Sequence, residues 1–289
     1  MKYYKITNES ENHNGFQYKT GLNVDTNKFD PVPYCGGGMF YASKDILAFL
    51  DYGCWLREVT IPVGVPVVEV NDYDTQKFKS PQIVLGERKR IDLDTIKELI
   101  EHGADVTADD NYAIRWASET GHLEVVKLLL DNGADVTADG NGAIRWASHS
   151  GHIDVVKLLI EHGADVTADN NYAIVLASQN GHIDVVKLLI EHGADVTAND
   201  NHAIKWASDN GHLEVVKVLI DNGADVTSGD NQAIKWASGS GHIDVVKLLI
   251  EHGADVTAGD NYAIRWASEN GHLEVVKLLI DNGADKSVI

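Results

Sequence analysis

The stretch DDNYAIRWASETGHLEVVKLLLDNGADVTA, residues 109–138, decides the fold because the chain repeats it with few changes up to residue 289. Gly-Ala-Asp recurs every 30 residues from Gly103 to Gly283, and Gly-His recurs with the same step from Gly121 to Gly271. The segment 91–108, IDLDTIKELIEHGADVTA, matches only the second half of this unit. A fixed period of this length is the signature of a repeat architecture. We expect a half repeat at 91–108 and six repeats at 109–138, 139–168, 169–198, 199–228, 229–258 and 259–289.

Each unit predicts two short helices joined by a tight turn. Asn111, like its counterparts in the other units, is placed to cap the first helix by accepting a hydrogen bond from an amide at its start. Gly121 supplies the positive φ that the turn between the helices requires. In the second helix, apolar residues recur at helical spacing from Leu123 to Leu130, and Gly133 ends the helix.

One such helix pair cannot bury its apolar sides alone, so neighbouring units must stack. We therefore expect a mostly α protein, with a helical solenoid of 30-residue repeats over residues 91–289. Residues 1–90 differ in composition, since they hold every proline, every phenylalanine and both cysteines. This part is expected to be a small α+β domain that caps the solenoid. Its apolar runs predict a helix at 44–52 capped by Ser43, and strands at 2–7, 16–20, 38–43, 55–62, 66–70 and 82–86.

The sequence GHLEVVKLLLDNGADVTA (121–138) resembles the second half of an ankyrin repeat, and AIRWAS (113–118) stands where that family has Thr-Pro-Leu-His-Leu-Ala-Ala. The resemblance covers residues 91–289 and implies an ankyrin-repeat solenoid that grips a partner on its concave face. Ankyrin repeats run ~33 residues, so the shortening between Ala108 and Tyr112 implies blunt β-turn fingers. Short repeats behind a small N-terminal module also resemble the ankyrin proteins of giant amoeba viruses of the mimivirus type.

The charge of the chain excludes one class of partner. The formal net charge is −20, and residues 91–289 carry all of it, with 13 basic and 33 acidic residues. A surface of this sign does not bind nucleic acid by neutralising phosphates, so the expected partner is a protein with a basic patch. No stretch approaches the ~20 apolar residues of a membrane helix, and the first residues lack a signal peptide's apolar core. We expect an intracellular protein of the host cytoplasm.

Positions that vary between units are either solvated or part of a binding face, because stacking explains the invariant ones. One column begins at Tyr112, a basic column begins at Arg115, and a third is the residue pair before each Gly-His. By resemblance to ankyrin proteins, the first and third columns line the concave face. Drift among duplicated units is the alternative, and Val175-Leu176 is either an apolar anchor or a repacked core. The predicted partner-binding residues are Tyr112, Glu119, His149, Tyr172, Gln179, His202, Asp209, Gln232, Tyr262 and Glu269.

The histidines and cysteines predict no metal site. Six histidines follow glycine, one in each unit, where a repeating structural hydrogen bond explains them, and none forms the i, i+4 pair of a helical metal site. The two cysteines are too few for a disulfide scaffold or a four-cysteine zinc site. The tryptophans that recur from Trp116 to Trp266 are interpreted as packing. Near helix ends, where imidazole meets the negative end of the helix dipole, lie His102, His162, His192 and His252.

Residues 37–43 and 56–59 faintly resemble a segment of ADP-ribosyltransferases. The resemblance implies an alternative in which Tyr41 stacks on nicotinamide and Glu58 or Glu69 is the catalytic carboxylate. A glycine turn between two strands explains the pattern as well, and Cys35 is either a nucleophile or an ordinary turn residue.

Our principal prediction is a non-enzymatic adaptor that binds a protein through the solenoid and uses no cofactor or metal. A further alternative is a structural protein that self-assembles through the C-terminal repeat. That repeat matches the internal sequence, whereas solenoids need polar caps at their ends. Val275, Leu278 and Leu279 are therefore expected to leave apolar surface available there.

Overall fold

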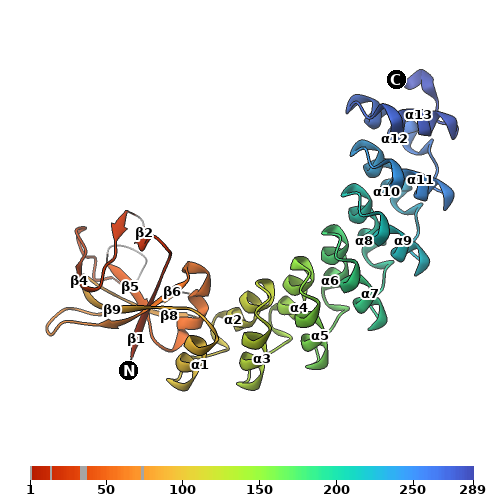
Figure 1. The fold of residues 1–289 in the computed structure, drawn as a ribbon. Helices are drawn as coiled ribbons and strands as arrows, with labels where there is room; N and C mark the ends of the chain where they lie inside the picture. The colour runs from red at the N-terminus through yellow and green to blue at the C-terminus, as the bar shows by residue number, and fades with distance from the viewer. Residues whose placement is uncertain (1, 14, 33–37, 73–74) are drawn as a thin grey trace. The chain divides into compact units, whose positions relative to one another are not determined.

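The computed structural model describes residues 2–13, 15–32, 38–72 and 75–289 (Figure 1). The chain divides into two compact units. Unit 1 comprises the chain up to Ser118 together with His122–Asp139, and unit 2 comprises Glu119–Gly121 together with Gly140–Ile289.

Among the described residues of unit 1, a seven-stranded antiparallel sheet has the strand order β4-β9-β6-β1-β5-β8-β7. The predicted strand at 16–20 ends at Gln17, and β4 and β8 were not predicted. The β8 sequence TQKFKS reads as polar, yet Lys79 within it is fully buried. The strands are β1 (Tyr3–Thr7), β2 (Asn12–His13), β3 (Phe16–Gln17), β4 (Gly21–Val24), β5 (Met39–Ala42), β6 (Trp55–Thr60), β7 (Val68–Asp72), β8 (Thr75–Ser80) and β9 (Gln82–Arg90).

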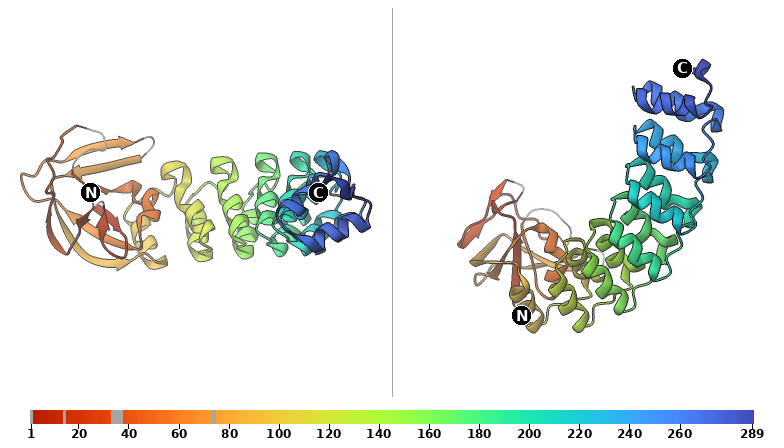
Figure 2. Two further views of the ribbon diagram at one scale, coloured as in Figure 1. Left: turned by 90° about the horizontal axis from the view of Figure 1, so that it is seen from above. Right: turned by 45° about the vertical axis from the view of Figure 1, so that its right-hand side comes forward.

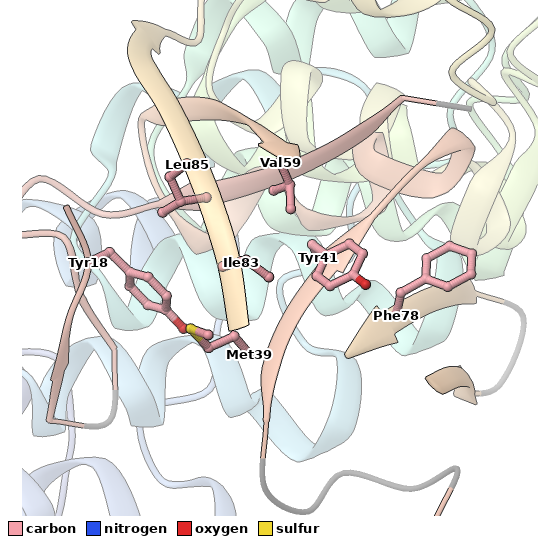
Figure 3. Close-up of a cluster of buried hydrophobic side chains, with 7 residues drawn as sticks. All are labelled: Tyr18, Met39, Tyr41, Val59, Phe78, Ile83 and Leu85. Atoms are coloured by element: carbon pink, nitrogen blue, oxygen red, sulfur yellow. The ribbon is translucent and has the colours of Figure 1, made fainter. Parts of the chain in front are cut away.

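One face of this sheet carries a buried apolar cluster (Figure 3). Tyr41 and Phe78 stack with ring centroids 6.0 Å apart, and Tyr3 packs edge-on against both rings. The segment η1 (Lys44–Tyr52) is a 3₁₀ helix whose Ile46, Leu47 and Leu50 are buried. The predicted Ser43 cap is wrong, because its Oγ donates to the carbonyl of Lys2 at 2.9 Å. The cluster consists of Tyr18, Met39, Tyr41, Val59, Phe78, Ile83 and Leu85.

The repeats form the predicted helix pairs, which confirms a helical solenoid preceded by a small α+β module. Unit 1 contains α1 (Leu93–Glu101), α2 (Ala108–Glu119) and α3 (Leu123–Asp131). In unit 2 the first helices lie along one side and the second helices along the other (Figures 1 and 2). The first helices are α4 (Ala138–Ser150), α6 (Ala168–Gln179), α8 (Ala198–Asp209), α10 (Ser228–Gly239) and α12 (Ala258–Glu269). The second helices are α5 (Ile153–Glu161), α7 (Ile183–Glu191), α9 (Leu213–Asp221), α11 (Ile243–Glu251) and α13 (Leu273–Asp281), and η2 (Lys286–Val288) follows.

Three residues of left-handed backbone precede the regular part of each first helix. In α6 they are Asp169, Asn170 and Asn171, with φ of 51°, 56° and 62°. Left-handed backbone is unfavourable for most side chains but is tolerated by glycine, asparagine and aspartate. The equivalent three positions of all six repeats hold only these residue types, and all of them have positive φ. The turn therefore restricts its own sequence.

The predicted capping role of the asparagine in this turn is wrong. Asn171 Oδ1 accepts a hydrogen bond from the backbone N–H of Asp195, 24 residues further on, at 2.7 Å. The side chain thus joins the turn that begins a repeat to the loop that ends the same repeat, instead of capping its own helix. The same bond, at 2.7–2.8 Å, links Asn111 to Asp135 in unit 1 and, in unit 2, is accepted by Asn141, Asn201, Asn231 and Asn261.

The half repeat obtains the equivalent bond from the N-terminal module. It has no first helix of its own, and the N–H of Asp105 donates to the carbonyl of Lys44, the first residue of η1, at 2.6 Å. Asp105 occupies the position of Asp135 one repeat earlier. Within unit 1, η1 therefore accepts the bond that the missing first helix would accept.

Four of the six Gly-His pairs make the structural hydrogen bond expected for them. In unit 2, Nε2 of His182 donates to the carbonyl of His149 at 2.9 Å, and its ring lies against Gly151. His152, His212 and His242 make the same bond to the preceding repeat.

All four Glu-His-Gly histidines lie at helix ends as predicted. His162, His192 and His252 bond through Nδ1 to a carbonyl in the last turn of their helix. His102 instead lies within hydrogen-bonding distance of Lys2 Nζ and Tyr4 Oη.

We predict that Gly151→Ala lowers the free energy of unfolding by more than ~2 kcal/mol, because a left-handed alanine costs ~1 kcal/mol and overpacking adds 1–3 kcal/mol. Gly151 has φ +78°, and a Cβ there would lie 2.5 Å from Nδ1 of His182. Gly163→Ala is the matched control, since Gly163 has φ +92° and nothing lies within 4 Å of its added Cβ. Urea titration measures both variants. Equal losses would contradict a role for the His182 contact.

A second prediction concerns acid stability. Hydrogen bonds from the hydroxyl and the N–H of Thr167 hold the pKa of Asp165 below its usual 3.8. A lowered folded-state pKa stabilises the protein above pH ~4, and this stabilisation is lost as pH falls through the folded-state value. Thr167→Val should therefore be less stable than wild type at pH 6 and equally stable at pH 2. Thr167→Ser, which keeps the hydroxyl, should follow the wild type across the same urea titrations.

Candidate functional site

All ten predicted partner-binding residues lie on first helices. Tyr112 lies on α2 in unit 1 and is half-buried, and Glu119, the last residue of that helix, is exposed. In unit 2, Tyr172 on α6 and Tyr262 on α12 are 40% and 41% exposed. Glu269 is also exposed, whereas the half-buried members are His149, Gln179, His202, Asp209 and Gln232. We call the solvent-facing side chains of α4, α6, α8, α10 and α12 the first-helix face of unit 2.

The tryptophans contribute to this face, although the sequence suggested packing alone. Trp146 is 40% exposed, and the others are half-buried. Trp206 and Trp236 of adjacent repeats lie 5.4 Å apart, and Trp266 lies edge-on to Tyr262 at 5.3 Å. Each tryptophan follows the first varying column by four residues, so both point to the same side of the helix. That spacing was the signal that could have revealed it.

Two members of the third column bind neighbouring repeats. His149 Nδ1 accepts from the Asn180 side chain at 3.1 Å, and Asp209 Oδ1 accepts from Ser240 Oγ at 2.9 Å. These contacts orient the two side chains along the edge of the first-helix face. A partner that contacts them therefore meets preorganised polar groups.

The basic column varies together with a position 24 residues further on. Arg145 pairs with Asp169 of the next repeat, Nη1 to Oδ2 at 2.9 Å, and in unit 1 Arg115 pairs with Asp139 at 2.7 Å. Val175 is apolar, and Asn199 at the matching position is uncharged. Val175 is only 3% exposed, which favours the repacked core over the apolar anchor.

In later repeats the basic residue of this column pairs with an aspartate of its own repeat. Lys205 has Gly229 at the matching position and turns back to Asp200 of its own repeat, Nζ to Oδ2 at 2.7 Å. A Cβ at Gly229 would lie 2.7 Å from that Nζ. Lys235, Asp230 and Gly259 repeat the arrangement. The residue in the basic column and the residue 24 positions later change together. Structural constraint therefore explains this variation better than drift does.

The acidic partner of Lys205 is held in its charged form. Hydrogen bonds from Lys205 and then from Ser228 lower the pKa of the Asp200 carboxyl. The Lys205 side chain is only 4% exposed. The first helices α8 and α10 thus carry lysines whose charge is balanced by an aspartate of the same repeat.

The ADP-ribosyltransferase alternative fails at Tyr41. Its ring is 3% exposed within the core cluster, and its hydroxyl lies 2.8 Å from Ser80 Oγ, so it is not available to stack on nicotinamide. Glu58 and Glu69 are exposed on β6 and β7. Cys35 and Gly37 lie outside the described residues.

The expected apolar surface of the C-terminal repeat is wrong for two of its three residues. Val275 and Leu279 are 2% and 0% exposed, because α13 packs on α12 within its own repeat. Leu278 is half-buried. This removes the basis for self-assembly through these side chains.

The described part of the chain contains neither a metal-ligand cluster nor a membrane-spanning helix. No three His, Cys, Asp or Glu side chains group there as metal ligands would. Nor does any helix within these ranges have the length and apolar character that crossing a membrane demands.

We predict that Asp200→Asn destabilises the protein more than Asp169→Asn does. Asp169 pairs with a partly exposed arginine, and such a pair contributes ~0.2–1 kcal/mol. Asp200→Asn instead leaves a nearly buried ammonium without its counter-charge. Urea unfolding at pH 7 measures both variants. Equal losses of unfolding free energy would show that burial of the Lys205 ammonium adds nothing to the cost of losing its partner.

The comparisons agree with this architecture. A family model of ankyrin repeats matches residues 88–170, 167–230 and 227–289. An uncharacterised protein of Acanthamoeba polyphaga mimivirus is 40% identical over 127 residues, 42% of this chain and 92% of its own length. Two other proteins of that virus, named for ankyrin repeats, are each 36% identical across 42% of this chain and across 63% and 44% of their own lengths.

A solved structure is also similar. The crystal structure of the human ASB11 ankyrin repeat domain has a TM-score of 0.55 and 26% identity, covering 60% of this chain and 84% of that one. Ankyrin repeats indicate a protein–protein interaction scaffold. With its paired helices and family match over residues 88–289, this chain belongs to the ankyrin-repeat family.

Proposed function

We propose that this chain is a non-enzymatic adaptor that binds a protein partner on the first-helix face of unit 2. The observation that carries the proposal is the row of exposed aromatic side chains there. Trp146, Tyr172 and Tyr262 are each 40–41% exposed on α4, α6 and α12. Aromatic anchors dominate the binding energy of protein interfaces, because they bury large area and lose little entropy.

The charge of the repeats supports a basic contact region on the partner. Residues 91–289 carry 33 acidic and 13 basic residues. Within the basic column of the first-helix face, Arg145, Lys205 and Lys235 pair with aspartates, and Glu269 on α12 is exposed. Complementary charge speeds association and rejects partners of the same sign.

The relatives support an intracellular site of action. They are encoded by a virus of an amoeba, so we place the partner in the host cytoplasm. The N-terminal module supplies a second, separate surface. An adaptor of this kind holds one protein on its repeats and a further ligand on its module.

The test uses the full chain as bait in lysate of the amoebal host. We expect the double variant Trp146→Ala/Tyr172→Ala to lose a captured protein by at least ~30-fold in affinity, because two aromatic anchors are removed. Leu273→Ala is the matched control, since Leu273 is 74% exposed on the second helix α13. Titration of the captured protein against each variant measures the change.

The outcomes separate the parts of the proposal. Retention of the partner by the double variant, with loss in Leu273→Ala, would place binding on the second helices and contradict the proposed face. Binding that is indifferent to salt between 50 and 500 mM would remove the electrostatic part, because exposed charges are screened over this range.

A further inference from the structure

The N-terminal module contains a cavity where β1 and β5 separate. These strands pair at one position, Tyr4 with Ala42, whereas β1 pairs with β6 along its whole length. Beyond that pair, the Lys5 side chain reaches toward β5 and donates to the carbonyl of Phe40 at 2.8 Å. The cavity that opens between these strands and η1 has a volume of about 270 Å³.

The walls of the cavity are mostly aromatic and apolar. Phe40 comes from β5, and Phe49 and Tyr52 come from η1, with their ring centroids 5.8 Å apart. Tyr52 is 52% exposed, and its ring lies 6.1 Å from that of His13 on β2. The remaining wall consists of Tyr4, Ile6, Tyr41, Ala42 and Ile46.

The titratable nitrogen groups in the lining are Lys5, Lys77 and His13, and among the described residues no carboxylate belongs to it. Burial and the nearby Lys5 lower the pKa of His13, which favours its neutral form. Glu11 lines an adjoining small cavity with Lys5, but both of its oxygens accept hydrogen bonds from Arg57, at 2.7 and 2.8 Å. The carboxylate beside Lys5 is therefore already neutralised by another side chain.

Lys5 is an unusual residue for such a place. Its side chain is buried, with 6% of the residue exposed, and its Nζ lies 4.4 Å from the centroid of the Tyr18 ring. Burial lowers the pKa of its ammonium to about 8. An ammonium held by one carbonyl and one ring lacks an opposite charge, so an anion placed beside it would gain a strong, poorly screened interaction.

The volume limits the size of an occupant. A cavity of ~150 Å³ accepts benzene, so about 270 Å³ holds one ring with a small substituent. Aromatic walls favour a flat ring through offset or edge contacts.

We propose that this cavity binds a small aromatic molecule that carries one anionic group. The ring lies against Phe40 and Phe49, and the anionic group is received by Lys5. The site is independent of the first-helix face and gives the N-terminal module a ligand of its own.

Three probes of one shape test the proposal on the full chain: benzoate, neutral benzamide and cationic benzamidine. Saturation-transfer NMR detects binding, and titration gives the affinity. We expect benzoate to bind at least ~10-fold more tightly than benzamide, and benzamidine not to bind. Equal affinity for benzoate and benzamide, or no binding of benzoate, overturns the proposal.

Variants then locate the site. Lys5→Met should weaken benzoate at least ~10-fold, while Lys19→Met should leave it unchanged, because Lys19 is exposed and outside the lining. Equal affinities in these two variants overturn the assignment. If Lys5→Met does not fold, the comparison of the three probes on the wild type still decides.

Discussion

The hydrogen bond that each turn asparagine accepts from the last loop of its own repeat is the constraint on which the solenoid depends. Asn171 is 9% exposed, and its Oδ1 accepts from the N–H of Asp195 in the loop that ends repeat 169–198. A bond of this kind contributes ~0.5–1.5 kcal/mol, and here it ties the start of a repeat to its end. The left-handed backbone at three residues places the side chain for this bond, and it limits those positions to aspartate, asparagine and glycine.

The N-terminal module accepts the equivalent hydrogen bond from the half repeat through a backbone carbonyl instead of an asparagine side chain. The carbonyl of Lys44 accepts from Asp105 as Asn111 accepts from Asp135. Within unit 1, the ion pair of Lys89 with Glu98 adds a second link between the sheet and α1. The module thus satisfies the exposed end of the half repeat, and a cavity opens where β1 and β5 diverge.

The sequence predicted what repeats locally and missed what depends on distant partners. Helix pairs and Gly121 followed from spacing, because their causes lie within one or two turns of helix. The Gly-His bonds followed from their recurrence in every unit, although each acceptor lies 33 residues away. The role of Asn111 was wrong because its partner lies 24 residues away. Val275 and Leu279 were expected to be exposed, since the sequence does not show that α13 buries them against α12 of the same repeat. Lys5 and Lys79 were not noticed because lysine is rarely buried. The ten residues predicted for the partner all lie on first helices, and their role in binding stays a prediction.

The two kinds of cation pairing have a consequence for how such arrays grow. Every full repeat makes the asparagine bond within itself, so a copied repeat carries that bond wherever it is inserted. Arg145 needs an acidic residue in its successor, whereas Lys205 needs a glycine there. A repeat transplanted between these contexts would stack correctly yet meet the wrong side chain. These pairs therefore restrict which repeat can follow which. Unequal recombination within the gene would leave a junction where the basic residue and the first turn residue of the next repeat do not match.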